Sequence, residues 1–573
     1  MTDEPVNAVR DVRLDVAALI SARAEWEPHW RDVERMILPR RGRWLTNRKD
    51  KQGDYLNRDI LDATGTYASR TLTAGLMTGM TSPMRKWFSL RHPRPEVMSK
   101  RAVKVWIHEV TEVLRRLMAS SNLYRTLPQV YAESSGFGTG AMSQHEGKGR
   151  GVFKRNWVSR AYTVGEYAIA SDHNGDVSTF VRKSPITAAQ IESMFPDSVP
   201  NRVDRALKAG QRHVSWELVH YVAPMREPLA DKWPEVAGRR FFSLYYLGES
   251  LGNHNYGAQY ANEPELEVGG YSRFPFNVFR WSLRAGDDWG RGVGMEALPD
   301  VKQLQALTRQ YQAAVALSVK RPMQAPDSVR ESGGVNAVPG GMTYYSDRSR
   351  NAAPIQPLYE VDPDHQAVLM VIQDLRQRID RAFYADLFLA SLGEQRSNIT
   401  AREIEERSQE KLMALGDAYQ RAQDELLRPV VENAFRLAVQ LDLLPPPPPE
   451  LQGQELEIQF ASILEESIQA IEQVAYDRYA GGLTVFQQLL QRPIEEIDWM
   501  KVIDHYTRVS GIDPDVMRDP EAVAQDQRAR ADAQLQQVQT EQTAQLAGAA
   551  RDASQVQVSG RNLAELAVDA TAN

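Results

Sequence analysis

The segment with the most suggestive chemistry is rich in glycine and reads SGFGTGAMSQHEGKGRG, at residues 135–151. A phosphate-binding loop requires the pattern GxxxxGK[ST], in which backbone N–H groups surround the phosphates and the lysine contacts them. Here Met142 stands where the first glycine is required, and Gly149 follows Lys148 in place of serine or threonine. We therefore predict no nucleotide site, and instead a turn or a close approach of two backbones, for which glycine is suited.

A second segment, SDHNGDVS, imitates the start of a calcium-binding loop with Asp172, Asn174 and Asp176. Such a loop needs glycine at its sixth position and a bidentate glutamate at its twelfth, and this chain has valine and lysine there. Asn174-Gly175 between two runs rich in β-forming residues is typical of a type I′ turn. The sequence therefore predicts a β-hairpin here and no calcium site.

Other catalytic patterns are also missing from the sequence. The ten histidines form neither HxxxH nor HExxH, no GxSxG is present, and the lack of cysteine excludes thiolate metal sites and cysteine nucleophiles. One acidic cluster shares a predicted helix with basic residues at offsets typical of a solvated face; it contains Glu403, Glu405, Glu406 and Glu410 beside Arg402, Arg407 and Lys411. We therefore predict no enzymatic activity, no cofactor and no metal ion.

Hydrophobic periodicity indicates which elements must carry these segments. Apolar residues that recur every three to four positions predict helices over 10–40, 62–80, 96–119, 295–321, 363–388 and 400–441, the last kinked or broken near Pro429. Alternating patterns predict strands within 152–182, 214–222 and 240–247. Capping boxes at Thr187–Gln190 and Thr400–Glu403 predict helix starts. Beyond the five prolines at 445–449, we predict a helical segment over 462–506 and then a tail that is either a helix needing neighbours or disordered.

The predicted helix over 62–80 is unusual because its residues are small and uncharged. The uncharged run covers 14 residues, 71–84, which is short of the ~20 needed to cross a bilayer. At 100° per residue, one narrow stripe contains Gly65, Ala68, Leu72, Gly75 and Gly79. Small residues at this spacing predict close packing against another backbone, in the same subunit or in a neighbouring one.

Composition limits the remaining possibilities. With 573 residues, 42% hydrophobic and 25% charged, the chain is typical of soluble globular proteins, and its polar N-terminus does not resemble a signal peptide. The formal net charge is −7. Proteins that hold nucleic acid tightly normally have a basic balance or a basic stripe, so any DNA handled by this protein would be guided rather than held.

Three segments, together with the order of the elements, resemble the portal proteins, or head-to-tail connectors, of short-tailed bacteriophages. The segments are DATGTYASRTLTAGLMTGMTSPMRKWFSL (62–90), GFGTGAM (136–142), and LPDVKQLQALTRQYQAAVALSVKRP (298–322) paired with NITAREIEERSQEKL (398–412). The resemblance covers about residues 10–445. Beyond the prolines it is limited to helical character.

The resemblance implies a mainly helical α+β portal fold that assembles as a ring of twelve subunits around double-stranded DNA. Its parts would be a wing at 1–294, a first stem helix at 295–321, a clip at 322–362, a second stem helix at 363–388, a tunnel loop at 389–399, a wing helix and proline spacer at 400–449, and a crown with a helical tail or barrel at 450–573. Twelve copies would carry a formal charge of −84, and a channel of like sign would let a duplex slide without adhering.

The resemblance also implies sites for DNA and for partner proteins. The tunnel loop would place in the DNA channel Leu392, Gly393, Glu394, Gln395, Arg396 and Asn398, and the stem would end at Lys320 and Arg321. The clip would present to the motor and tail Arg330, Tyr344, Tyr345, Arg348 and Arg350. Two interpretations stay open for Arg396, Lys320 and Arg321: screened contacts with DNA, which fade over about 8 Å at physiological salt, or salt bridges between subunits.

The implied function is that of a portal at one capsid vertex, which docks the packaging motor and then the tail while DNA passes in and out of the head. The implied partners are further copies of the chain, the terminase motor, major capsid and scaffold proteins, tail adaptor proteins and double-stranded DNA without sequence specificity. We expect the protein in the virion, after synthesis in the host bacterial cytoplasm, and we expect no membrane partner because no basic amphipathic stripe is present. The alternatives are a hydrolase or nuclease with an unrecognised site, or a long-helix scaffold.

Overall fold

The computed structural model describes residues 8–39, 57–98, 100–147, 157–250, 265–319, 323–324, 356–357, 364–385, 415–460, 520–555, 557–558 and 561–562. They belong to two compact units, the first within residues 1–89, 110–444 and 458–467, and the second within 90–109, 445–457 and 468–573. The fold mixes helices and sheets with helix predominant, as the sequence predicts.

The first unit begins with two helices where the sequence predicts one. The break at residues 25–26 separates α1 (Ala8–Ala24) from α2 (Glu27–Met36), which has a proline in its first turn. Trp26 and Trp30 are nevertheless stacked, with 6.1 Å between ring centroids. Trp30 is fully buried and its indole N–H donates to the carbonyl of Phe137 at 3.0 Å, so α2 is fixed to the end of a distant helix.

Two antiparallel sheets form the β part of the first unit. The five-stranded sheet is a simple meander of β4 (Tyr167–Ser171), β5 (Val177–Thr187), β6 (Ser215–Pro224), β7 (Phe241–Ser250) and β8 (Glu267–Tyr271). The three-stranded sheet has the order β3 (Trp157–Tyr162), β2 (Thr139–Glu146), β9 (Phe276–Arg280). Short helices α7 (Ala188–Met194), α8 (Asn201–Lys208) and α9 (Glu227–Lys232) and the 3-10 turns η1 (Pro196–Ser198) and η2 (Pro234–Val236) connect the larger strands. Val12 and Val16 of α1 lie in one core cluster with Tyr221 and Phe242 of the larger sheet.

The hairpin between β4 and β5 is present, but its turn is not of type I′. That turn requires a positive φ at both central residues, and only Gly175 has one, at 87°. The Gly175 N–H bonds to the Asp172 carbonyl at 3.0 Å, and Asp172 N–H bonds to the Asp176 carbonyl at 2.8 Å. This is a three-residue loop with glycine in the left-handed position, a turn that lets Asn174 keep an ordinary φ. The predicted capping box at Thr187 is confirmed, because both of its reciprocal hydrogen bonds with Gln190 are present.

Further helices pack around α6 (Leu123–Phe137), which ends at Gly138 in the left-handed conformation. One of them is α3 (Thr64–Met80), which contacts α6 over much of its length and also contacts α10 and α12. Earlier in the chain come β1 (Phe88–Arg91), α4 (Pro95–Met98) and α5 (Arg101–Ser120); α4 and the first part of α5 belong to the second unit.

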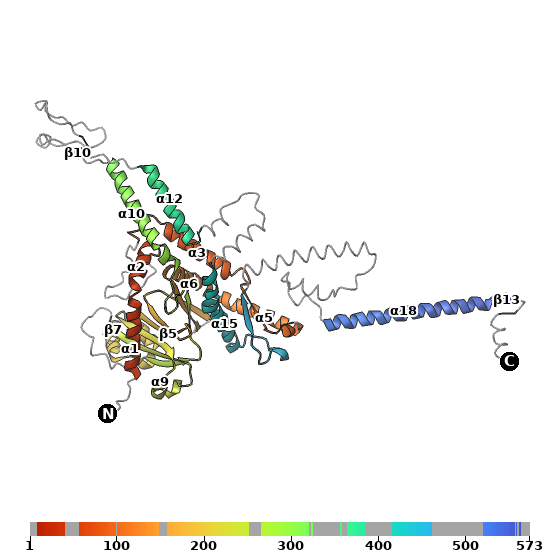
Figure 1. Cartoon of the computed structure of the whole chain (residues 1–573). Coiled ribbons are helices and arrows are strands. Elements are labelled where there is room, and N and C mark those ends of the chain that lie inside the picture. The colour runs from red at the N-terminus through yellow and green to blue at the C-terminus, as the bar shows by residue number, and fades with distance from the viewer. Residues whose placement is uncertain are drawn as a thin grey trace, which may run out of the picture. The chain divides into compact units, whose positions relative to one another are not determined.

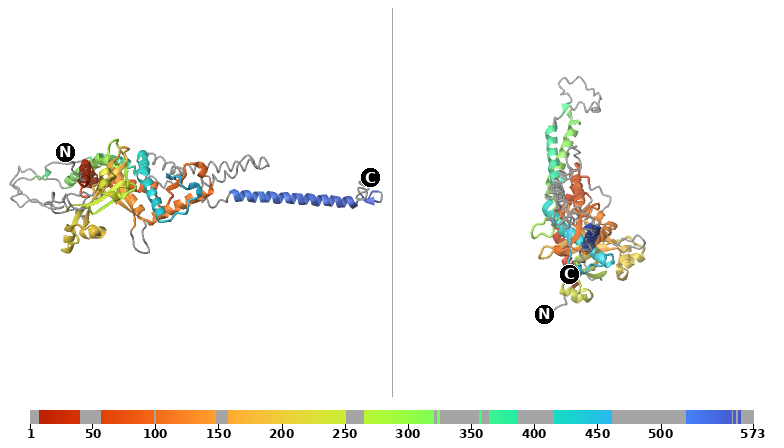
Figure 2. Two further views of the ribbon diagram at one scale, coloured as in Figure 1. Left: turned by 90° about the horizontal axis from the view of Figure 1, so that it is seen from below. Right: turned by 90° about the vertical axis from the view of Figure 1, so that its right-hand side faces the viewer.

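Two long helices, α10 (Val293–Val319) and α12 (His365–Ala382), run side by side in Figure 1 and in the right-hand view of Figure 2. Close to their outer ends lie the two-residue strands β10 (Met323–Gln324) and β11 (Gln356–Pro357), which are paired antiparallel. We call α10 and α12 together the helical arm.

The helix predicted to be kinked or broken near Pro429 is irregular there, because a π-helical turn lies just before that proline. Residues 415–421 are α-helical, the turn η3 (Ala422–Leu427) follows, and α15 (Arg428–Gln440) ends five residues before Pro445. Pro429 lies in the first turn of α15, where the ring removes no needed hydrogen bond. After α15, the chain forms the 3-10 turn η4 (Pro449–Leu451) and then the strand β12 (Glu457–Phe460).

The second unit contains the proline segment and the long helix α18 (Pro520–Gln555), followed by the paired strands β13 (Gln557–Val558) and β14 (Arg561–Asn562). Within it, the Trp106 indole N–H donates to the Pro445 carbonyl at 2.9 Å, and Lys100 pairs with Glu450 at 3.1 Å. No helix in the described part of the chain is both long and apolar enough to span a bilayer.

Candidate functional site: the helical arm and its base

The helical arm is antiparallel and joined along its length by polar contacts. Arg378 of α12 pairs with Asp300 of α10 at 2.6 Å near the base. Further out, the Tyr311 hydroxyl lies 3.1 Å from His365 Nδ1. Near the base the arm has a buried apolar side, which includes Val301, Leu304, Ile372, Leu375 and Ile379. The base of the arm is therefore packed as part of the first unit's core.

The outer half of the arm is different, because it has no acidic or basic side chain and, within residues 310–319 and 366–373, every side chain except Ile372 is at least partly exposed. Residues 310–319 (QYQAAVALSV) and 366–373 (QAVLMVIQ) contain no acidic or basic side chain. Apolar side chains are nevertheless exposed there: Leu369 is 50% exposed, Met370 72%, Val371 47% and Val319 76%. Contiguous exposed apolar surface of this kind is typical of a protein–protein interface.

At its base, the arm is tied to the start of α3 by one buried carboxylate and one buried amide. The Gln305 side-chain oxygen accepts hydrogen bonds from the N–H groups of Leu61 (2.7 Å) and Asp62 (3.0 Å), and its side-chain N–H donates to the Asp62 carbonyl at 2.6 Å. Arg376 of α12 donates twice to the Asp62 carboxylate, at 2.8 and 2.9 Å. Burial alone would raise the pKa of Asp62, but hydrogen bonds from Thr64 and Arg376 outweigh it and lower that pKa.

The glycine-rich segment at 136–140 packs against a second glycine cluster at the start of α10. An added Cβ at Gly138 would lie 2.0 Å from the Gly290 carbonyl oxygen, and one at Gly292 would lie 2.6 Å from the Gly138 nitrogen. One at Gly294 would lie 2.7 Å from the Gly136 carbonyl oxygen. The predicted close approach of backbones is thus confirmed, and it positions the first turn of α10 against the end of α6.

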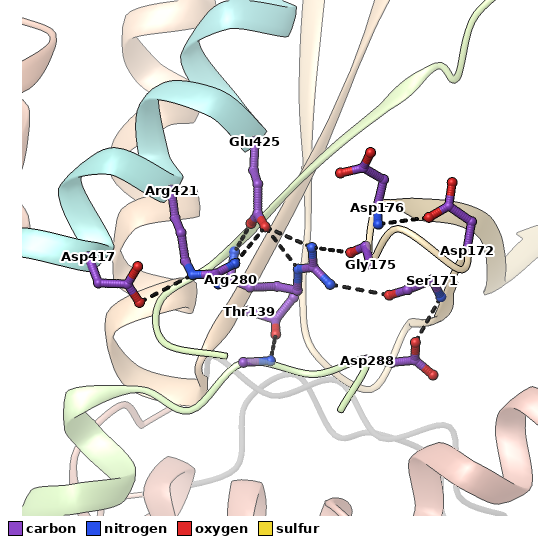
Figure 3. Close-up of polar contacts among 11 residues, drawn as sticks. Thr139, Ser171, Asp172, Gly175, Asp176, Arg280, Asp288, Asp417, Arg421 and Glu425 are labelled. Atoms are coloured by element: carbon purple, nitrogen blue, oxygen red, sulfur yellow. Dashed lines mark hydrogen bonds and ion pairs between the residues drawn. The ribbon is translucent and has the colours of Figure 1, made fainter. Parts of the chain in front are cut away.

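Beside this contact lies a buried arginine that joins the π-helical turn to the β4–β5 hairpin (Figure 3). Arg280, at the end of β9, is 2% exposed and pairs with Glu425 of the π-helical turn at 2.7 Å. Its guanidinium also donates to Ser171 Oγ at 3.2 Å and to the Gly175 carbonyl at 2.8 Å in the β4–β5 hairpin. The Arg280 backbone N–H donates to the other oxygen of Glu425 at 2.8 Å. A buried charge pair satisfied in this way fixes orientation more than it adds stability.

The helix-packing residues predicted on α3 are all within the described part of the chain. Ala68 is 2% exposed and Leu72 is fully buried, while Gly75 and Gly79 are half-buried. The buried row continues instead through Leu76 and Met80, which lie one position further along the helix. The packing role of Gly75 and Gly79 stays a prediction.

At Gly65, the close neighbour belongs to the same chain. An added Cβ there would lie 3.2 Å from Val301 Cγ2, so this glycine lets α3 approach α10. An added Cβ would require the Val301 side chain to shift by a few tenths of an ångström.

The other predicted site residues lie outside the described residues. They are the tunnel-loop residues Leu392, Gly393, Glu394, Gln395, Arg396 and Asn398, the stem-end residues Lys320 and Arg321, and the clip residues Arg330, Tyr344, Tyr345, Arg348 and Arg350. The predicted capping box at Thr400–Glu403 and the acidic cluster at 403–410 also lie outside them. Among the residues that are described, no three His, Cys, Asp or Glu side chains are grouped to hold a metal ion.

Comparison with known proteins identifies the family. The model of a protein family described as "Bacteriophage head to tail connecting protein" matches residues 11–517 of the chain. The chain belongs to this family. The probable portal protein of Bordetella phage BPP-1 is 34% identical over 518 residues, which is 90% of this chain and 90% of that protein. The portal protein of Salmonella phage epsilon15 is 30% identical over 513 residues, 89% of this chain and 88% of that protein.

A solved structure described as "Virion of native gene transfer agent (GTA) particle" is also similar, with 10% identity and a TM-score of 0.30 over 74% of this chain and 93% of that chain. Family membership confirms the resemblance seen in the sequence. The protein functions as a phage portal, a structural connector of the virion and not an enzyme.

Several residues that organise the arm's base were not singled out from the sequence. Gln305, Arg376, Arg280 and Glu425 resemble ordinary polar residues of helices and strands, and their partners lie more than 100 residues away. Asp62 had a local signal, because an aspartate side chain readily accepts a hydrogen bond from the backbone N–H two residues later, although the N-cap of α3 is Ala63. Its Oδ1 indeed accepts from the Thr64 N–H at 2.9 Å.

Proposed function

We propose that about twelve copies of this chain form a closed ring at one capsid vertex, and that double-stranded DNA passes through its centre. In this assignment the wing consists of residues 1–294 and 400–449. The stem consists of residues 295–321 and 363–388, which contain most of α10 and all of α12. The clip is 322–362 and the tunnel loop is 389–399. The remaining residues, 450–573, form a crown with a helical tail or barrel.

The observation that carries the proposal is the exposed apolar surface of the arm's outer half. Leu369, Met370 and Val371 are consecutive, and each step along an α-helix turns about 100°, so they point over roughly 200° of the helix surface. Since α10 lies on one side of α12 only, this surface extends beyond what one partner helix covers. A ring supplies a neighbour on each side, through two different faces of every subunit.

The charge pattern supports a conduit rather than a DNA-binding protein. Residues 310–319 and 366–373 of the arm contain no lysine or arginine, and the whole chain has a net charge of −7. Affinity for duplex DNA comes mainly from lysine and arginine contacts with phosphates. A stem with this surface would let DNA move through the ring in either direction.

The remaining assignments follow from the portal role. The clip, with Arg330, Tyr344, Tyr345, Arg348 and Arg350, would dock the terminase motor and later the tail adaptors. The wing would meet the major capsid and scaffold proteins, and Arg396, Lys320 and Arg321 would contact either DNA or a neighbouring subunit. In α18, Leu535, Val538 and Leu546 are 50–70% exposed, and neighbouring copies of the same helix in a barrel would cover them. Synthesis in the host cytoplasm would precede incorporation into the capsid.

Mass measurement and electron microscopy of the purified chain test the proposal. We expect particles of about twelve times 64.6 kDa with a central hole lined by α10 and α12. Because assembly can depend on scaffold protein, the measurement is repeated with capsid and scaffold proteins co-expressed. Particles in which α10 and α12 line no channel, under either condition, would refute it.

A further inference from the structure

The helical arm has two outer edges, and each edge contains one charged and one apolar side chain. On α10, Tyr311 faces α12, because its hydroxyl contacts His365 at 3.1 Å. Arg309 and Ala313 lie two positions before and after Tyr311, so each is turned about 160° away from it. Both side chains are exposed. We call Arg309 and Ala313 the α10 edge.

Helix α12 has a corresponding edge on the other side of the arm. Ile372 of α12 is 5% exposed and belongs to the buried apolar side of the arm. Met370 and Asp374 lie two positions before and after Ile372, so each is turned about 160° away from that buried side. Met370 is 72% exposed, and Asp374 is exposed as well. We call Met370 and Asp374 the α12 edge.

The charges of the two edges are separate from the ion pairs within the first unit. Inside the arm, Arg378 of α12 pairs with Asp300 of α10 at 2.6 Å. Neither Arg309 nor Asp374 has an ion-pair partner within the described part of the chain. Their charges are opposite, and they lie on opposite sides of the same element. Two such charges attract when the arm of one copy lies beside the arm of the next.

The spacing within the two edges also matches. Rotation about an axis along the arm leaves α12 of the next copy antiparallel to α10, as it is within one chain. Four residues forward on one antiparallel helix are therefore level with four residues back on the other, and each covers about 6 Å. When Arg309 is level with Asp374 of the next copy, Ala313 is level with Met370 of that copy. The charges then meet, and the long apolar side chain lies over the short one.

We propose that the α10 edge of one copy packs against the α12 edge of the next, with Arg309 paired to Asp374 and Met370 covering Ala313. This contact is the stem interface of the proposed ring, and so it rests on the proposed function. It joins two different faces, so it repeats from copy to copy until the ring closes. An exposed ion pair adds little affinity, so this one sets the register, while Met370 contributes buried apolar surface.

Towards the base of the arm, the same register brings one pair of like charges level. Arg381 of the next copy would lie near Lys302 of α10. The Lys302 amine already pairs with Asp32 of α2 at 2.6 Å, so its charge is compensated within its own chain. The attraction between copies therefore comes from the two edges further out.

Exchange of charges tests the pairing. Arg309→Asp and Asp374→Arg each place like charges at every contact, so each should reduce the fraction of chains in rings at least about tenfold. The double variant restores opposite charges and should recover the parent fraction. Co-expression of the two single variants should recover it as well, in rings where they alternate. Mass photometry measures the fractions. Arg125→Asp, the same change at an exposed residue of α6, is the matched control.

Cross-linking tests the contact without a change of charge, and the chain has no cysteine of its own. Ala313→Cys combined with Met370→Cys should give a ladder of linked chains on a denaturing gel, after reaction with a thiol cross-linker of about 8 Å, close to the spacing of packed helices. Each single-cysteine variant should stay unlinked, because a contact between two different faces does not bring the same residue of two copies together.

Three results would overturn the contact: parent ring yield in both single charge variants, no recovery in the double variant or the co-expressed pair, or no ladder from the double-cysteine chain. Thermal unfolding checks that every variant is folded. Particle mass is measured on the cross-linked samples. A ladder from open chains that never close would uphold the contact and contradict the proposed function. Closed rings without a ladder would overturn the contact alone, so the two ideas fail separately.

Discussion

At the scale of single residues, the interior of the first unit contains side chains whose ionisation conflicts with their burial. His220, on β6, is 6% exposed, is stacked on Tyr245 with 3.9 Å between centroids, and lies 3.1 Å from Ser243 Oγ. Burial, with smaller contributions from Arg182 and His145, lowers the pKa of His220 to about 3. The native structure therefore requires this imidazole to be neutral.

The low pKa of His220 predicts a loss of stability in acid. Between pH 6.5, the ordinary histidine pKa, and pH 3, the unfolded chain binds a proton at this position that the folded chain does not. The free energy of unfolding should consequently fall as pH decreases through this range, by up to about 1.4 kcal/mol per pH unit. Denaturant unfolding at several pH values measures the slope. His220→Gln should reduce it, while replacement of the exposed His173 should not; equal slopes in both variants would contradict the assignment.

Just before α10, the neighbouring backbone leaves no room for a side chain at Gly292, and this gives a second prediction. An alanine Cβ at Gly292 would lie 2.6 Å from both the Gly138 nitrogen and the Ser135 carbonyl oxygen, which are backbone atoms that cannot rotate away. Gly292→Ala should therefore destabilise the protein by about 1–3 kcal/mol or more. Gly269→Ala is the control, because nothing lies within 4 Å of its added Cβ. Thermal unfolding that gives both variants the same melting temperature would refute the close-approach interpretation.

At the scale of elements, the arm depends on a few polar contacts where it meets α3. Gln305 of α10 and Arg376 of α12 each form a hydrogen bond with Asp62, which lies just before α3. The amide of Gln305 satisfies two backbone N–H groups and one carbonyl of the segment that precedes α3. A buried polar group without a hydrogen-bond partner costs free energy of folding, so the Gln305 side chain holds α10 in place against the segment before α3.

Replacing Gln305 should loosen that connection. Gln305→Ala leaves the N–H groups of Leu61 and Asp62 without their partner, and we expect a loss of about 1–3 kcal/mol in the free energy of unfolding. Hydrogen exchange at these two amides should become faster than in the parent protein. The exposed neighbour Gln303 is the matched control. Unchanged exchange at Leu61 and Asp62 in Gln305→Ala would show that the contact does not hold the arm.

At the scale of the whole molecule, the proposed ring explains why the outer half of the arm exposes apolar side chains: neighbouring subunits would cover them. A charge at Met370, which is 72% exposed, costs little in a single subunit but would be buried against a neighbour in the proposed ring. Met370→Asp should therefore leave the melting temperature of subunits nearly unchanged and reduce the ring fraction strongly. Gln377→Asp, exposed on the charged half of α12, should assemble normally. Mass photometry compares the two, and rings of normal yield in Met370→Asp would contradict this role of the surface.

Local patterns were sufficient for much of the fold and for the family. Apolar periodicity predicted α3 and α10 to within two residues at each end and the start of α12 equally well, although α12 ends at Ala382 rather than at residue 388; the capping box at Thr187 marked the start of α7 correctly. These features depend on neighbours only a few positions away in the chain, which a sequence displays directly. The same holds for the prediction that the glycines at 136–140 serve a close backbone approach rather than a nucleotide.

The tertiary structure decided which distant segments those local features meet. Gly138 needed Gly290, Arg280 needed Glu425, and Asp62 needed Arg376, and each pair is separated by more than 140 residues. The turn at Asn174 also differs from the local prediction. Both this turn, through Gly175, and the π-helical turn before Pro429, through Glu425, are hydrogen-bonded to Arg280. Sequence determined the elements through short-range sterics and periodicity, whereas burial and long-range hydrogen bonding, which require the folded chain, determined how they are joined.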